Sequence, residues 1–125
     1  MKNAKTPDPP ALTQRTTDFA LRIIRMYSSL PKSSVAQVLG NQILRSGTSI
    51  GANYREANRA RSKAEFIAKM GDSLKKLDET CYWQELLSES GTVVTAKLQD
   101  VEDESRQLMA IFITIIKRAK STKEE

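Results

Sequence analysis

Two groups of basic side chains carry the residue types that bind phosphate. One group lies near the middle of the chain and the other near its carboxyl end; their members are Arg55, Arg59, Arg61, Lys63, Lys117, Arg118 and Lys120. Lysine and arginine release counterions when they contact a nucleic-acid backbone. Only 6% of the residues are aromatic, so few side chains can stack on bases. The pattern predicts contact with the backbone of RNA or DNA and little sequence preference.

Residue types needed for common catalytic sites are missing. The sequence contains no histidine, which excludes a Ser-His-Asp or Cys-His site within one chain. It also has no Walker sequence and no G-x-G-x-x-G motif after a strand. The single cysteine, Cys81, lies on an apolar stripe, where a thiolate is disfavoured. We therefore expect a protein that is not an enzyme and has no cofactor or metal site.

Four segments with helical spacing of apolar residues must position the basic groups. The first spans residues 16–30, the second opens with the capping-box pattern Ser34-x-x-Gln37, and the third opens with Ser62-x-x-Glu65 and ends at Gly91. The fourth begins near Thr95. Because the connections are short, the sequence predicts an all-α, antiparallel, up-down-up-down four-helix bundle.

This order of helices sorts the charges by end. It brings the two basic groups and Arg15 to one end, and it brings a group of carboxylates that includes Glu104 to the other. Helix dipoles favour cations at C-termini and anions at N-termini, which explains most of this distribution without any ligand. The third helix, which begins with Lys63 and ends with Glu85 and Glu89, runs against its dipole.

Length and composition indicate one globular domain. The 125 residues are 39% hydrophobic and 28% charged, with a net charge of +5. We expect a disordered N-terminal tail over residues 1–14, the bundle over residues 15–120 and a disordered C-terminal tail over residues 121–125. No apolar run is long enough to span a membrane, and no secretory signal is recognisable. With only one cysteine, these features predict a cytoplasmic protein.

The second helix contains an unusual number of weak helix formers. Gly47 and Gly51 cost roughly 1 kcal/mol each relative to alanine. Gly51 is therefore expected at a close contact between helices. Beside the apolar stripe lies a polar one, which we expect to be buried: Gln42, Arg45, Ser46, Ser49, Asn53 and Glu56. It fits either a crossing between helices of one chain or a contact between subunits.

The third and fourth helices have more apolar surface than one bundle needs. The main stripe of the third helix is Phe66, Met70, Leu74, Leu77 and Cys81. Further apolar residues lie outside the main stripes of the two helices: Tyr82, Trp83, Leu86, Leu87, Ile111 and Ile113. A wider apolar face favours a second partner, so these residues are predicted to form a homo-oligomer interface. The alternative is that loops and the tail cover them.

The region from residue 18 to residue 119 resembles a bacterial four-helix bundle family. Its members include proteins encoded in intervening sequences of large-subunit (23S) ribosomal RNA genes. The residues that match its pattern are Leu30-Pro31, Gln42, Arg45-Ser46, Ser49-Ile50, Asn53, Glu56, Arg61, Ser73-Leu74, Glu79 and Leu86-Leu87. The chain is more distantly similar to the accessory protein of diversity-generating retroelements, a basic homopentamer that binds nucleic acid and a reverse transcriptase.

Two functions remain open at this point. The resemblance implies a small, non-enzymatic, homo-oligomeric bundle, with a pentamer favoured and with RNA, DNA or a reverse transcriptase as partners. It provides no catalytic residues. The first function is nucleic-acid binding through the basic end. The second is a protein–protein interaction module that binds no nucleic acid and docks other proteins or further subunits.

Overall fold

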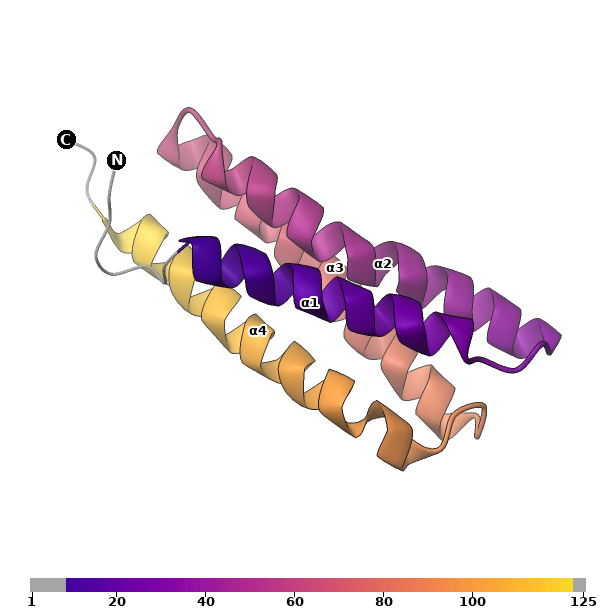
Figure 1. Cartoon of the computed structure of the whole chain (residues 1–125). Helices are drawn as coiled ribbons and strands as arrows, with labels where there is room; N and C mark the ends of the chain where they lie inside the picture. The colour runs from indigo at the N-terminus through magenta and orange to yellow at the C-terminus, as the bar shows by residue number, and fades with distance from the viewer. Residues whose placement is uncertain (1–8, 123–125) are drawn as a thin grey trace.

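The computed structural model describes residues 9–122, and nearly all of them lie in four helices. These are α1 (Pro9–Ser28), α2 (Ser34–Asn58), α3 (Lys63–Glu89) and α4 (Thr95–Ser121). Consecutive helices run antiparallel and are joined by short turns (Figure 1). α2 packs most extensively on α3, whereas α1 and α4 have the least backbone contact of the neighbouring pairs. The predicted four-helix bundle is confirmed.

The first helix begins earlier than the sequence predicted. α1 starts at Pro9, so residues 9–14, which were expected in the N-terminal tail, are helical. Proline is well tolerated in the first turn of a helix, because the N–H that it lacks would have no helical acceptor there. Leu12, which lies within the expected tail, is only 2% exposed and joins the core. Residues 1–8 and 123–125 lie outside the described part of the chain, and Ser121 still belongs to α4.

The caps of the helices decide where α2 and α3 start and where α3 ends. α2 is capped by Ser33, whose hydroxyl accepts a hydrogen bond from the Ala36 N–H, so the predicted box at Ser34 is wrong by one residue. α3 is capped by Ser62, as predicted. Gly91 has a φ of 75°, the left-handed conformation that glycine adopts readily at the end of a helix. The predicted end of the third helix is therefore confirmed.

The glycines of α2 receive side chains from α1. A Cβ atom at Gly47 would lie 2.9 Å from Ile23 Cγ1, and one at Gly51 would lie 3.0 Å from Thr16 Oγ1. Any larger side chain would push α1 away from α2. The close helix contact expected at Gly51 is confirmed, and the approach of α1 explains Gly47 and Gly51.

The core fills the space between all four helices. Its fully buried large side chains include Phe19, Ile23, Ile43, Ile50, Met70, Leu77, Leu87, Leu98, Leu108 and Phe112. The rings of Tyr54 and Phe112 stack with their centroids 5.9 Å apart. Within residues 9–122, no helix is both long enough and apolar enough to cross a lipid bilayer.

Candidate nucleic-acid interface

The turn between α2 and α3 presents the first basic group. α2 ends at Asn58, and its final carbonyls accept the N–H groups of Arg59 and Ala60. The hydroxyl of Ser62 caps α3 from the other side, so only a few residues separate the two helices. Arg55 in the last turn of α2 is exposed, as are Arg59 and Arg61 on the turn.

Contacts between helices bring the second basic group to the same end. The Lys63 ammonium at the start of α3 donates to the backbone carbonyl of Thr122, which directly follows α4. The last turns of α4, with Lys117, Arg118 and Lys120, therefore lie at the same end of the bundle as the turn between α2 and α3 (Figure 1). The Arg55 guanidinium also donates to the Thr17 hydroxyl of α1, at 3.0 Å.

The positive charges of the two basic groups are not neutralised by ion pairs among the described residues. The ion pairs among residues 9–122 are Arg15–Glu104, Lys69–Glu56, Lys76–Glu79 and Arg106–Asp103, and none of them uses a residue of the two basic groups. Nearby carboxylates are already engaged. Lys69 binds Glu56 at 2.9 Å, and this hydrogen bond raises the pKa of the Lys69 ammonium. Glu65 accepts the backbone N–H of Arg61 at 3.2 Å.

Arg15 does not add free charge to the basic end. Its guanidinium donates two hydrogen bonds of 3.0 Å to the carboxylate of Glu104, and a third to Gln107 at 3.1 Å. The sequence had placed Arg15 and Glu104 at opposite ends of the bundle. The structure pairs them across the seam between α1 and α4, because both residues lie away from the ends of their helices.

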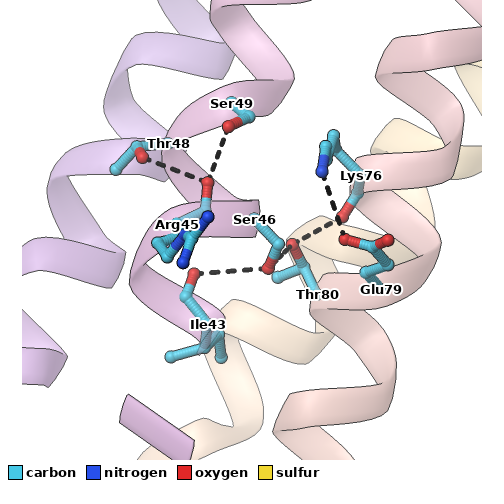
Figure 2. A network of polar contacts seen from close by, with 8 residues as sticks. All are labelled: Ile43, Arg45, Ser46, Thr48, Ser49, Lys76, Glu79 and Thr80. Carbon is cyan, nitrogen blue, oxygen red and sulfur yellow. Dashed lines mark hydrogen bonds and ion pairs between the residues drawn. The ribbon is translucent and has the colours of Figure 1, made fainter. Parts of the chain in front are cut away.

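Within one chain, the polar stripe predicted for α2 is buried only at Ser46, and its burial between subunits stays a prediction. Gln42, Arg45 and Glu56 are exposed, and Ser49 and Asn53 are half-buried. The buried polar residue on this helix is Ser46, next to Arg45. Figure 2 shows the polar contacts around these residues. Arg45 contributes its backbone carbonyl, which accepts a hydrogen bond from the Ser49 hydroxyl at 2.7 Å. One residue along a helix is a rotation of about 100°, enough to move a side chain from solvent to the core.

Buried polar atoms of α2 and α3 meet at positions of which the sequence analysis had named Ser46 and Ser73 but not Thr80. The Thr80 hydroxyl lies within hydrogen-bonding distance of Ser46 Oγ, at 2.9 Å, and of the Lys76 carbonyl oxygen, at 2.8 Å, and its one proton can go to either (Figure 2). Ser73 donates to the Ile50 carbonyl at 2.7 Å. These contacts join α3 to α2 within one chain.

A further buried polar contact joins α3 to α4. Gln84 donates to the Ser105 hydroxyl at 2.8 Å, and that hydroxyl donates to the Val101 carbonyl at the same distance. The buried face of α3 is Met70, Ser73, Leu77, Thr80, Gln84 and Leu87. Of the stripe predicted for this helix, Phe66, Leu74 and Cys81 are only partly buried. The helical spacing of these six residues is visible in the sequence. Ser73, Thr80 and Gln84 were nevertheless not assigned to the core, because they are polar.

The residues of the predicted oligomer interface differ in their burial within one chain. Leu87 is completely buried, so its assignment to a subunit interface is wrong: it packs in the core of one chain. Trp83, Leu86 and Ile111 are half-buried. Within this predicted set, the exposed residues are Tyr82, with 53% of its surface exposed, and Ile113, with 39%.

Cys81 is half-buried between charged neighbours. Burial raises the pKa of its thiol, and the negative charge of Asp78 raises it further. A neutral thiol is a poor nucleophile, so this environment does not activate the residue.

Comparison with known proteins agrees with this architecture. The sequence model described as 23S rRNA-intervening sequence protein matches residues 11–114. The chain belongs to this family. A solved structure of a protein of unknown function from the S23 ribosomal protein family of Bacteroides thetaiotaomicron has 40% sequence identity and a TM-score of 0.79. The match covers 84% of this chain and 97% of that one. No curated protein matches the chain.

Proposed function

We propose that this member of the 23S rRNA-intervening sequence protein family is a non-enzymatic homo-oligomer that binds the backbone of RNA or DNA through its basic end. The observation that carries the proposal is the convergence of seven cations from two distant segments, none of them in an ion pair within residues 9–122. Such a cluster attracts phosphates because contact releases counterions. The family name concerns the genes of ribosomal RNA, which makes RNA the first ligand to test.

A binding experiment on three arginines tests this proposal. Changing Arg55, Arg59 and Arg61 together to glutamine should weaken binding to every RNA or DNA sequence tried. The dependence of log affinity on log salt should also flatten, by roughly 0.7 to 0.9 for each lost phosphate contact. Fluorescence anisotropy over a salt series measures both effects.

A matched control removes the same charge elsewhere. Arg22, Arg25 and Arg45 are exposed and lie on α1 and α2 outside the basic end. Their triple glutamine variant should keep most of the affinity, because the net charge changes equally but the phosphate contacts remain. Equal losses in the two triple variants would point to a non-specific charge effect. A wild-type protein with no affinity for RNA or DNA at low salt would rule the function out.

The second candidate is a protein–protein interaction module without nucleic-acid binding. It is favoured by the exposed apolar side chains Tyr82 and Ile113 on the third and fourth helices. A reverse transcriptase is the partner that the distant resemblance suggests, and five copies is the assembly that it suggests. Measurement of the mass in solution and co-purification with a reverse transcriptase test these two expectations.

A further inference from the structure

The groove between α3 and α4 opens to solvent on the outside of the bundle. Its volume is about 320 Å³, and its lining residues are Gly71, Leu74, Lys75, Asp78, Met109 and Ile113. Leu74 and Met109 pack against the core and form an apolar base. Lys75 and Asp78 are exposed, and neither has an ion pair within residues 9–122. The groove is therefore an apolar site flanked by a cation and then by an anion along α3.

Gly71 leaves the α3 side of this groove without a side chain. It lies in the interior of α3, where glycine weakens a helix relative to alanine. Apart from its own stretch of helix, no atom lies within 4 Å of the position that a Cβ of Gly71 would take. Packing within one chain therefore does not require a glycine here, and the bare backbone suits the close approach of another molecule.

The outer face of α1 has features that match the groove. Its residues Gln14, Asp18, Leu21, Arg25 and Ser28 are spaced by four, three, four and three positions, which places them on one face, and all five are exposed. Leu21, at 44% exposed, is an apolar side chain between an anion and a cation. Asp18 accepts a hydrogen bond from Gln14 at 2.9 Å, but neither Asp18 nor Arg25 has an ion pair within residues 9–122. We call these five residues the α1 strip.

The order of the charges selects one orientation of two copies. α1 and α3 run in the same direction from the basic end (Figure 1). Along this direction the α1 strip presents Asp18, Leu21 and then Arg25, and the groove presents Lys75 and then Asp78. In a parallel pair of copies, Asp18 therefore faces Lys75 of the partner subunit and Arg25 faces Asp78 of the partner subunit. An antiparallel pair would set like charges against each other, which is unfavourable.

We propose that a second copy of this chain docks side by side and parallel, with Leu21 of its α1 strip inserted into the α3–α4 groove. The contact joins two different surfaces, so it can continue from copy to copy and closes into a ring when the rotations complete a turn. α1 neighbours α2 and α4 but not α3, so the strip and the groove do not point in opposite directions. Successive copies therefore turn, and a ring may have an odd number of members, five included.

This inference rests on the homo-oligomer proposed above and specifies how its basic surface is built. Parallel copies bring their basic ends to one side of the assembly. One nucleic-acid strand can then contact several basic ends at once, and each further contact is strengthened because it forms within the same complex.

Two variants, each defective in one surface, test the contact. Gly71→Leu fills the groove, and Leu21→Asp removes the apolar side chain that enters it. Both positions have open space in the folded chain, so both variants should keep the circular dichroism spectrum of the wild type. Alone, each should show a dissociation constant of self-association that is higher by about tenfold or more in sedimentation.

Mixing these two variants distinguishes a contact between different surfaces from a symmetric one. The Gly71→Leu chain keeps an intact α1 strip, and the Leu21→Asp chain keeps an intact groove. An equimolar mixture should therefore form particles of two chains and no larger assembly. Folded variants that stay monomeric in the mixture, or that assemble alone as the wild type does, would overturn the proposal.

A charge exchange tests the pairing of Arg25 with Asp78 of the partner subunit. Arg25→Asp should weaken association by about tenfold or more, because two carboxylates then face each other. Adding Asp78→Arg to the same chain should restore it, and a double variant as weak as the single one would contradict the pairing. Arg25→Gln, which is part of the control variant for RNA binding, removes one attraction without adding a repulsion and should weaken association far less.

A disulfide test in a Cys81→Ser background gives the orientation. Copies that carry Asp18→Cys should cross-link to copies that carry Lys75→Cys, whereas an antiparallel pair would link them to copies that carry Tyr82→Cys. Preferred linking to Tyr82→Cys would overturn the parallel arrangement. A wild-type monomer at all concentrations would remove both this contact and the homo-oligomer, whereas assembly that none of these variants weakens would remove the contact alone. The affinity of the wild type for RNA is measured separately and decides the proposed function by itself.

Discussion

Gly51 and Gly71 look alike in the sequence, but their surroundings in the folded chain differ. Both lie inside helices, where glycine is disfavoured by about 1 kcal/mol relative to alanine. A Cβ at Gly51 would meet Thr16 of α1 at 3.0 Å, whereas a Cβ at Gly71 would meet nothing within 4 Å. The residue type alone does not distinguish a position held by packing from one that packing leaves free.

Leucine substitutions at these two positions should therefore have opposite effects. Gly51→Leu should lower the free energy of unfolding, because overpacking costs typically about 1–3 kcal/mol and the gain in helix propensity is under about 1 kcal/mol. Gly71→Leu should raise it by under about 1 kcal/mol. Denaturant titration at low, matched protein concentration keeps self-association out of the comparison. A Gly51→Leu variant as stable as wild type would contradict the close contact with α1.

The starts of α2 and α3 depend on single hydroxyl groups. Ser33 and Ser34 are adjacent, and either one could be chosen as the cap of α2 from the sequence. Only the Ser33 hydroxyl accepts the Ala36 N–H, at 3.1 Å, while Ser34 is the first helical residue. At the start of α3, Ser62 accepts the Glu65 N–H, and the Glu65 carboxylate accepts from Arg61 rather than from the cap residue itself.

Alanine substitutions separate these two serines. Ser33→Ala should destabilise the protein by about 1 kcal/mol, because one N–H group in the first turn of α2 loses its acceptor. Ser34→Ala should change the stability little, since alanine is the best helix former and Ser34 is exposed. Urea unfolding curves of the two variants give the comparison. If Ser34→Ala is the more damaging change, the helix begins one residue later than described.

At the scale of the whole bundle, α1 packs mainly on α2 and has limited contact with α4. Along this seam the Arg15–Glu104 pair provides two hydrogen bonds of 3.0 Å. The apolar attachment begins at Leu12, which lies in the core cluster although it is close to the start of the described chain. The first turns of α1 therefore belong to the folded domain.

Because Leu12 is buried, shortening its side chain should lower the stability of the protein strongly. Leu12→Ala should cost about 2–5 kcal/mol, as is usual for a leucine removed from a core. Leu21 on the same helix is 44% exposed, and Leu21→Ala should stay close to wild type. Thermal unfolding of both variants measures the difference. A mild effect at Leu12 would show that the start of α1 is only loosely attached.

The sequence by itself determined the four helices, their order and the end at which the basic residues gather. These features follow from local periodicity, turn residues and short connections, none of which needs a distant contact. The predicted start of α2 was wrong by one residue, because Ser33 and Ser34 have the same side chain. Only the direction of the hydroxyl decides which of them caps the helix.

Only the tertiary structure decided which polar residues are buried. Ser46 and Arg45 are neighbours in the sequence, yet Ser46 bonds to Thr80 of α3 and Arg45 points to solvent. Thr80 and Gln84 look like surface residues until their partners on α2 and α4 are placed against them. A helix pattern reports that one face is apolar, but a buried hydroxyl or amide is stable only where another helix supplies its hydrogen-bonding partner, and that partner is distant in the sequence.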